Sequence, residues 1–320
     1  MEEMRQRQPA GDSTAPGLWE TWYLEYRRYV FAVCYRMLGT AAEAEDAVQD
    51  CFLELRRRPL EQVANPKAYL AKMAVNRCLN LLSSARKQRE VYTGEWLPEP
   101  LNEAAGTDGS PGERLELGEE LSYACLVMLE RLKPAERAVW LLREVFEYEY
   151  AEIAEIVDKS ESNCRQLFSR ARRSLPSGME TMPAVQLSAS RRRLLDRFIA
   201  AFFAHDVDAM LELLADEPVF TADGGGQVHS VLRPMHGRKG VLALLTSRRV
   251  LTKLRGLRPQ IAVLNGEAQV VFAGEDGIIH AALCLEIPQD EERLRSFYLV
   301  VNPDKLRTLQ AAQTDKPDSP

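Results

Sequence analysis

Residues 149–175 read EYAEIAEIVDKSESNCRQLFSRARRSL. This stretch predicts two helices joined by a tight turn. Ile153, Ile156 and Val157 recur at helical spacing in the first helix, and Asp158-Lys159 then interrupts the pattern. Ser160 follows at the position where a side-chain oxygen accepts a hydrogen bond from a free amide of the next helix. The order is therefore helix, turn, helix.

The second helix of this stretch separates an apolar stripe from polar faces. The stripe repeats at i, i+3, i+4, i+7 and i+11, as Cys164, Leu167, Phe168, Ala171 and Leu175. The other faces carry Asn163, Arg165, Gln166, Ser169, Arg170, Arg172 and Arg173, and no acid follows Glu161 within the stretch. Such groups pair with base edges in the major groove of DNA and neutralise phosphates. An amphipathic hairpin with a solvated face is the alternative for this stretch alone, because its turn lacks a glycine.

The whole chain has 320 residues, of which 46% are apolar and 28% charged, as in a soluble protein of two or three domains. None of its six cysteines forms a Cys-x-x-Cys pair, and most fall on apolar helical faces. We therefore expect reduced thiols, a cytoplasmic location, no metal site and no cofactor. The N-terminus has no basic segment leading into an apolar run, and no run of eighteen apolar residues occurs, so we expect neither export nor membrane insertion.

The net charge of −6 conceals changes of sign along the chain. Residues 56–90 carry nine basic residues against two acids, whereas the charged residues of 43–54 are all acids. Nucleic acid responds to the local charge of a surface. Two basic surfaces separated by acidic ones favour a protein that contacts DNA twice and presents another face to a protein partner.

Three further helices are expected before the quoted stretch. We expect residues 1–17 to be disordered, and apolar spacing then predicts helices over 18–38, 41–57 and 66–89. Asn65-Pro66 supplies a cap and a first-turn proline for the third helix. One face of that helix carries a line of basic and amide side chains that includes Lys72, Asn76 and Asn80.

Two groups of motifs carry a resemblance to a known family. YRMLG at residues 35–39, AEDAVQDCF at 44–52, NPKAYL at 65–70 and AVNR at 74–77 look like the region-two domain of ECF sigma factors. LKPAER at residues 132–137, YAEIAEI at 150–156 and the helix at 160–175 are similar to the region-four helix-turn-helix of the same family. The two groups occur in the right order and at the right distance.

The resemblance implies binding to core RNA polymerase and promoter DNA, and we expect a monomer. It implies that Asp46, Gln49 and Asp50 of the acidic helix contact the polymerase. It implies that the loop at residues 58–65 and the third helix open the minus-ten element and hold a flipped base, for which the candidates are Lys67, Lys72, Asn76 and Asn80. The candidates for reading the minus-thirty-five element are Ser162, Asn163, Arg165, Gln166 and Arg170, with Arg172 and Arg173 beside them. Many members have a glycine in the turn at Asp158-Lys159, so the angle of the last helix stays open.

Composition divides the rest of the chain. Residues 91–112 and 177–189 are linkers, which bounds domains at 18–90, 113–176 and 190–306, followed by a flexible tail at 307–320. The last domain reads as helices over 190–205, 207–214 and 237–254 and as a run of antiparallel strands with a hairpin at Asn265-Gly266. The sequence thus predicts two all-α domains followed by an α+β domain. The element order of the α+β domain resembles the SnoaL-like, ketosteroid-isomerase-like cone.

Three short motifs match the subgroup of ECF factors that carry such a C-terminal cone: Trp96, Leu97 and Pro98; Asp223, Gly224, Gly225 and Gly226; and Asn302, Pro303, Asp304, Lys305 and Leu306. We expect the three motifs to form one interdomain contact surface through which the cone modulates activity. A small-molecule ligand inside the cone is a further candidate partner.

Two other classes of function stay open. One is a helix-turn-helix regulator that does not engage core polymerase. The other is a SnoaL-like isomerase or cyclase with an appended DNA-binding regulator, in which Asp223, His229, Arg233 and His236 supply a base and a donor near the mouth of the cone. An Asp before three glycines usually makes a turn, and fold alone does not carry function. We therefore favour regulation and expect no enzymatic activity.

Overall fold

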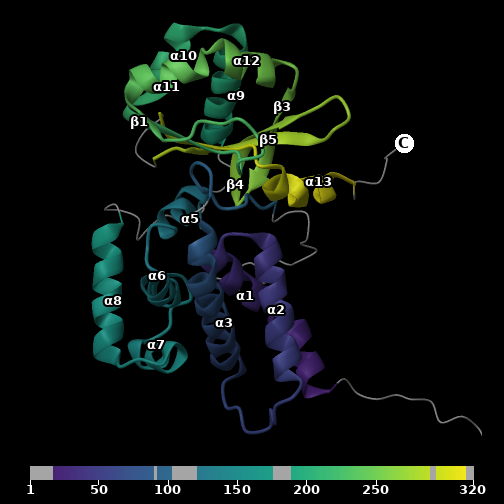
Figure 1. The fold of residues 1–320 in the computed structure, drawn as a ribbon, viewed down its shortest axis with the longest axis vertical. Helices are drawn as coiled ribbons and strands as arrows, with labels where there is room; N and C mark the ends of the chain where they lie inside the picture. Colours follow the sequence, from purple (N-terminus) through teal and green to yellow (C-terminus); the bar gives the residue numbers. More distant parts are fainter. Residues whose placement is uncertain (1–16, 90–91, 103–120, 176–188, 289–292, 315–320) are drawn as a thin grey trace, which may run out of the picture.

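The computed structural model describes residues 17–89, 92–102, 121–175, 189–288 and 293–314. Its lower part is helical, and its upper part is a six-stranded sheet with helices on both faces (Figure 1). Residues 1–16, 103–112 and 177–188, which the sequence predicts to be disordered or linking, lie outside the described residues. Among the described helices, none combines the length and apolar content needed to cross a membrane.

The first helical unit consists of α1 (Leu18–Leu38), α2 (Ala41–Leu55) and α3 (Pro66–Arg89), which bury apolar side chains against one another. Gly39 ends α1 with φ 78°, in the left-handed conformation. The predicted cap of α3 is confirmed, because Asn65 Oδ1 accepts a hydrogen bond from the Ala68 amide at 3.1 Å. Helix α2 is shorter than expected and ends at Leu55.

The second helical unit consists of α5 (Tyr123–Leu129), α6 (Pro134–Trp140), η2 (Leu141–Val145), α7 (Tyr150–Val157) and α8 (Glu161–Ser174). Helices α7 and α8 confirm the predicted helix-turn-helix. Asp158 ends α7 with φ 54°, so it takes the left-handed position that glycine holds in most such turns. Asp is one of the few other residues that tolerate this conformation. Ser160 Oγ accepts from the Asn163 amide at 3.3 Å and starts α8, as predicted.

The upper part contains α9 (Ala189–Ala204), α10 (Val207–Leu213), β1 (Leu214–Asp223), β2 (Met235–His236), α11 (Gly237–Leu245), α12 (Arg248–Arg255), β3 (Arg258–Leu264), β4 (Glu267–Ala273), β5 (Ile279–Glu286), β6 (Leu294–Val300), η4 (Pro303–Leu306) and α13 (Arg307–Thr314). The strand order is β2-β1-β6-β5-β4-β3. The predicted hairpin is confirmed, because Asn265 and Gly266 have φ values of 49° and 74° and join β3 to β4.

The described strands pair antiparallel except at one place. Strands β1 and β6 are parallel, so the expectation of a wholly antiparallel run is wrong there. Parallel neighbours require a long crossover connection, and the helices and strands between β1 and β6 provide it.

Two expectations about helices are also wrong. Residues 237–254 do not form one helix, because Ser247 Oγ accepts from the Val250 amide at 3.3 Å and starts α12 as a separate helix. Residues 307–314 form α13 rather than part of a flexible tail. Leu309 is buried, so apolar burial holds this helix against the sheet.

Separate apolar cores lie on the two faces of the sheet. On one face, α9 to α12 enclose a core that includes Phe198, Phe202 and Phe297. On the other face, Leu97 and Tyr123 of the helical part pack with the sheet, η4 and α13 (Figure 1). This second core joins the helical part of the chain to the α+β part.

Candidate nucleic-acid interface and interdomain junction

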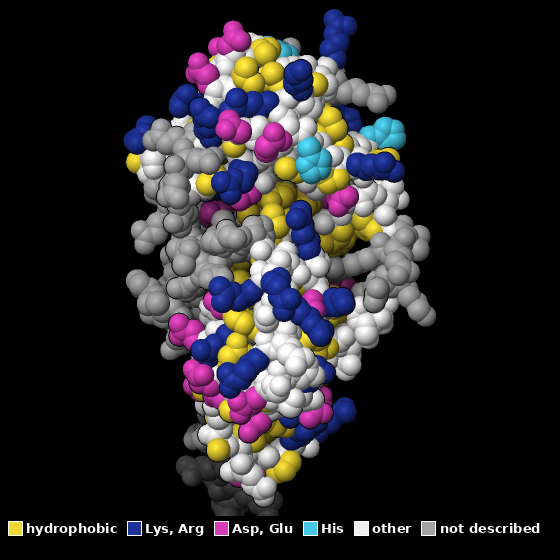
Figure 2. Space-filling model, turned by 90° about the vertical axis from the view of Figure 1, so that its left-hand side faces the viewer, with side chains coloured by type: hydrophobic (Ala, Val, Ile, Leu, Met, Phe, Trp, Pro, Cys, Tyr) yellow, Lys and Arg dark blue, Asp and Glu magenta, His cyan; other side chains and the backbone are white. Residues whose placement is uncertain are grey.

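Helix α8 presents its polar residues to solvent. All seven predicted DNA-reading residues are exposed: Ser162, Asn163, Arg165, Gln166, Arg170, Arg172 and Arg173. Five of them, together with Ser169, line a shallow open groove along the helix: Ser162, Arg165, Gln166, Arg170 and Arg173. Figure 2 views the molecule from the side of α8 and shows Lys and Arg side chains gathered there. A groove with hydroxyl, amide and guanidinium groups suits the phosphates and base edges of a duplex.

Neighbouring groups hold two of these guanidinium groups in place. Arg165 lies 4.4 Å from the centroid of the Tyr150 ring, and its Nη2 is 3.0 Å from Glu161 Oε2. Arg173 Nε donates to the Ser169 carbonyl at 3.2 Å. These contacts restrict the rotamers of both arginines, which reduces the entropy lost when they bind a phosphate or a base.

The predicted polar line on α3 is less open. Lys67 and Asn80 are exposed, whereas Lys72 and Asn76 are half-buried. Helix α7 packs against α3. The second helical unit therefore lies against the helix that carries this line.

A pair of tyrosines fastens the two helical units together. The hydroxyl groups of Tyr29 and Tyr148 are 2.8 Å apart in a buried hydrogen bond. The Phe146 ring meets the Tyr29 ring edge-on, with centroids 5.4 Å apart. Burial raises the pKa of both tyrosines, so both keep the proton that this hydrogen bond requires.

The acidic face of α2 is partly engaged. Asp46 and Gln49 are exposed, whereas Asp50 is half-buried and forms an ion pair with Arg77 of α3. The three predicted polymerase-contact residues lie on one helix, but Asp50 also ties α2 to α3.

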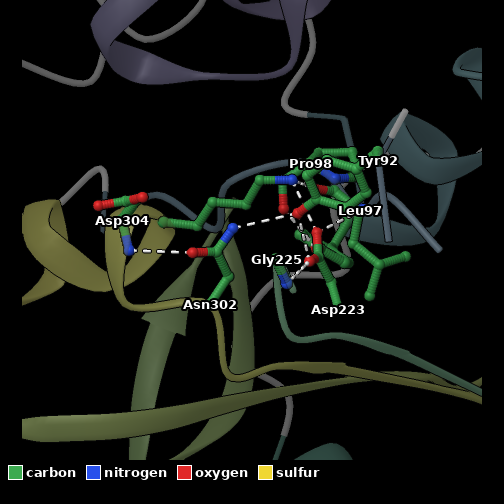
Figure 3. A network of polar contacts seen from close by, with 9 residues as sticks. Tyr92, Leu97, Pro98, Asp223, Gly225, Asn302 and Asp304 are labelled. Atoms are coloured by element: carbon green, nitrogen blue, oxygen red, sulfur yellow. Dashed lines mark hydrogen bonds and ion pairs between the residues drawn. The ribbon is translucent and has the colours of Figure 1, made fainter. Parts of the chain in front are cut away.

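Asp223, at the end of β1, is the centre of a network that joins the α+β part to the segment after α3 (Figure 3). Its side chain is fully buried. Oδ2 accepts from Lys305 Nζ at 2.7 Å and from the Leu97 amide at 2.9 Å. Oδ1 accepts from the Tyr92 hydroxyl at 2.5 Å and from the Gly225 amide at 2.9 Å. A buried charge is tolerated when it is paired and hydrogen-bonded in this way.

The Tyr92 hydroxyl keeps its proton in this network. Burial, and next the hydrogen bond to Asp223, raise the pKa of Tyr92. Its oxygen also accepts from Asn302 Nδ2 at 3.1 Å. Nothing in the sequence pattern indicated this tyrosine, because it lies in a segment with the composition of a linker.

Lys305 connects the network to the end of α1. Its Nζ lies 3.8 Å from the centroid of the Trp96 ring and also donates to the Leu97 carbonyl. The edge of the Trp96 ring contacts Gly39 so closely that a Cβ there would lie 2.5 Å from it. Gly39 is therefore required both by this contact and by its positive φ.

Glu99 links three parts of the chain. Its Oε2 accepts from the amide of Ala41, the first residue of α2, at 2.7 Å, and its Oε1 accepts from the Thr308 hydroxyl of α13 at 2.7 Å. Its own amide donates to the Gly39 carbonyl at 2.8 Å. Burial raises the pKa of Glu99. Sequence reasoning missed this residue, although its place between two prolines directly after the Trp96 motif was a signal.

We call the contacts between residues 92–101 and the C-terminal domain the junction. Asn265 extends the junction to the edge of the sheet at the β3–β4 hairpin. Its Nδ2 donates to the Tyr35 hydroxyl at 2.9 Å, and that hydroxyl donates to the Glu99 carbonyl at 2.6 Å. Its Oδ1 accepts from the Leu101 amide at 3.2 Å. The sequence identified Asn265 as a turn residue and gave no sign of these partners.

The structure brings the three predicted motifs to one place. Pro98 accepts from the Tyr123 hydroxyl through its carbonyl, and a Cβ on Gly225 would lie 2.4 Å from the Asn302 side chain. A Cβ on Gly224 would overlap the Val228 carbonyl, and Gly226 lies beside Thr93. Leu306 is buried, whereas Pro303 and Asp304 are exposed. The contact is a finding, and its regulatory role stays a prediction.

The residues of the isomerase alternative differ in burial and in partners. Aromatic rings pack against one another on the inner face of the sheet, with the centroids of Phe198 and Phe220 5.8 Å and 6.1 Å from that of Phe297. Asp223 is held at the junction instead, and His229, Arg233 and His236 are exposed. Asp223 is thus buried in contacts with Lys305 and Tyr92, apart from the exposed side chains that the isomerase alternative grouped with it.

Comparison with known proteins decides the family. Residues 22–88 match the model of Sigma-70 region 2, and residues 125–175 match that of Sigma-70, region 4. The chain is 32% identical over 286 residues to the ECF RNA polymerase sigma factor SigJ of Mycobacterium tuberculosis, which covers 87% of this chain and 90% of the relative. This chain belongs to the ECF sigma factors. It is an alternative sigma factor, which binds core RNA polymerase and directs transcription initiation at promoter DNA.

Other comparisons extend the likeness to the whole sigma factor. This chain is 31% identical over 298 residues to the probable ECF RNA polymerase sigma factor SigI of Mycobacterium tuberculosis, and the match covers 89% of this chain and 94% of the relative. The crystal structure of the extracytoplasmic function sigma factor SigJ superposes with a TM-score of 0.69 at 26% identity, covering 90% of this chain and 98% of that one. The helical units are thus regions two and four, and the C-terminal α+β domain belongs to the shared architecture.

Proposed function

We propose that this sigma factor engages its promoter through two surfaces and that its C-terminal domain regulates that engagement. The proposed roles are minus-thirty-five reading by the seven α8 residues, minus-ten opening by Lys67, Lys72, Asn76 and Asn80, and polymerase contact by Asp46, Gln49 and Asp50. The exposed polar face of α8 and the exposed acids of α2 support these roles.

The buried network around Asp223 is the observation that carries the regulatory part. It ties the C-terminal domain to the segment that follows region two through Leu97, Lys305 and Tyr92. Removing one partner of a buried ion pair leaves the other uncompensated, which is strongly unfavourable. These contacts share the Asp223 carboxylate, so we expect them to form and break together, as a regulatory element with two states requires.

Glu99 gives the junction a route to the polymerase-binding helix. Its carboxylate holds the first amide of α2 on one oxygen and the Thr308 hydroxyl of α13 on the other. Thr40, the residue before α2, makes no capping hydrogen bond with its own side chain. The C-terminal domain thus stabilises the group that completes the N-terminus of the helix bearing Asp46.

We infer that the C-terminal domain regulates and does not catalyse. The aromatic core inside the cone and the burial of Asp223 at the junction support this inference. The sigma factor would act in the cytoplasm with its polymerase. A ligand that binds inside the cone and displaces side chains of this core is one way to shift the junction.

Run-off transcription with purified core polymerase tests the proposal, on a pool of templates with randomised promoter elements and at stated salt. Thr308→Val removes the hydrogen bond to Glu99 and keeps the shape, whereas Arg307→Gln serves as the neighbouring exposed control. Thr308→Val and deletion of residues 307–320 should both change transcript yield, and the control should not. Unchanged yield for both would remove the regulatory role.

The same reaction separates the alternative class of function. A helix-turn-helix regulator that does not engage polymerase would fail to retain core polymerase in a pull-down and would give no run-off product. An isomerase would lose turnover of a carbonyl substrate in Asp223→Asn while keeping DNA binding.

A further inference from the structure

One stretch of the C-terminal domain differs in charge from the rest of the sigma factor. Residues 224–266 contain eight Lys or Arg residues and neither Asp nor Glu. The whole chain has 47 acids and a net charge of −6, so an even distribution would place about six acids in a stretch of this length. The positive charge of this stretch therefore comes both from its Lys and Arg residues and from its lack of acids.

Most of these basic side chains reach the surface. The exposed ones are Arg233, Lys239, Arg248, Lys253 and Arg258. Lys253 Nζ donates to the His229 carbonyl at 3.3 Å, which brings α12 beside the loop that carries Arg233. The Leu257 amide bonds to the Leu254 carbonyl, so the chain turns tightly from α12 to Arg258. We call Arg233, Lys253 and Arg258 the basic surface.

The basic surface lies close to the end of α3. The same loop touches the segment that follows α3, because Gly226 lies against Thr93 and Leu232 packs over Gly94. Helix α3 rises toward the C-terminal domain (Figure 1). The C-terminal end of α3 therefore leads toward the part of the C-terminal domain that carries Arg233.

We propose that the basic surface binds phosphates of promoter DNA and gives this sigma factor a third DNA contact that is independent of base sequence. Phosphate binding needs exposed Lys and Arg residues with few acids among them, and residues 224–266 contain no acid. A surface that binds a protein partner would instead carry exposed apolar or aromatic residues at its centre. Among the side chains described in residues 224–266, Leu232 is the one exposed large apolar residue.

Salt dependence of DNA binding tests the contact. The full-length sigma factor is titrated onto a fluorescein-labelled duplex of about 40 base pairs without promoter elements, between 50 and 200 mM KCl, and anisotropy is measured. Each phosphate contact adds about 0.9 to the slope of log K against log salt, so the variant Arg233→Gln, Lys253→Gln, Arg258→Gln should lose about 2.7. The change in Kd between the two salt concentrations should shrink by about 40-fold.

A second triple variant controls for total charge. Arg192, Arg193 and Arg197 are exposed on α9, and their replacement by Gln removes the same charge from the same domain. This control should keep the wild-type slope. The proposal would be overturned if the salt slope fell equally in both triple variants, or if it did not fall in the variant of Arg233, Lys253 and Arg258.

A single substitution and a polymerase measurement complete the test. Lys253→Glu should weaken duplex binding more than Lys253→Gln, because it adds repulsion to the loss of a contact. Both should bind core polymerase as the wild type does. Weakened polymerase binding with an unchanged salt slope would overturn the proposal in favour of a protein contact.

Discussion

The helices α8 and α3 are both assigned to DNA, yet the chain presents them differently. The polar residues of α8 are exposed along its length, whereas Lys72 and Asn76 of α3 are half-buried on a helix against which α7 packs. Duplex reading needs only an accessible helix face. Capture of a single strand needs α3 freed from region four. Under the proposed roles, this difference predicts that the chain reads a duplex in this conformation and rearranges before it holds a melted strand.

The largest expected effect comes from a substitution that breaks the junction between the segment after α3 and the C-terminal domain. Lys305→Met leaves the Asp223 carboxylate buried without its ion-pair partner, which should lower the free energy of unfolding by about 3–5 kcal/mol. Arg307→Met removes an exposed ion pair with Asp304 and should cost about 0–1 kcal/mol. Urea denaturation measures both. Similar values for the two variants would mean that the buried pair does not hold the domains together.

The next largest effect distinguishes the DNA contacts proposed for α8 from those proposed for α3. Arg165→Ala and Arg170→Ala should each weaken binding of the isolated protein to a minus-thirty-five duplex by about 1–3 kcal/mol. The matched pair Lys72→Ala and Asn76→Ala should leave that binding unchanged and lower open-complex formation with polymerase. Equal losses of duplex binding in both pairs would contradict the comparison.

A smaller effect concerns the contact between α3 and region four. Tyr148→Phe leaves the buried Tyr29 hydroxyl without its partner and should cost about 1–3 kcal/mol of unfolding free energy. The double variant Tyr29→Phe, Tyr148→Phe should be nearly neutral, because two apolar rings replace the pair. Thermal unfolding compares them. A double variant as unstable as the sum of the single variants would show that the two hydroxyl groups act independently.

The smallest effect concerns the turn before α8. Asp158→Gly relieves the left-handed backbone at φ 54° and should raise the free energy of unfolding by up to about 1 kcal/mol. Lys159→Gly gains no such relief, because its φ is not positive, and should lower it. A loss of stability in Asp158→Gly would show that the aspartate side chain itself holds the turn.

The sequence predicted the helical elements well, because local signals specify them. Asn65, Ser160 and the Asn265-Gly266 turn act within a few residues of their own positions, and their hydrogen bonds or φ values agree with the prediction. The split between α11 and α12 was missed, although Ser247 is the same kind of local signal. The pattern of apolar residues continues across it and concealed the break.

The junction could be predicted only in part. Asp223, Lys305 and Leu97 were identified through motifs, but nothing local pairs a buried carboxylate with one particular lysine. Tyr92, Glu99 and Thr308 were missed because their partners are 131, 58 and 209 residues away in the chain. Such contacts arise from the sheet topology, and the sequence predicted the wrong direction for one strand pair in that topology.

The parallel pairing of β1 with β6 has a consequence for how this family member can vary. Because the two strands run the same way, Asp223 lies opposite Val300 and the chain leaves both strands at the same edge, where Lys305 follows. Ala222 faces the inner core, so an insertion or deletion of one residue within β1 would rotate the carboxylate into that core. Insertions and deletions should therefore be confined to the loops. Strand β1 should keep its length and register even where its apolar residues are exchanged.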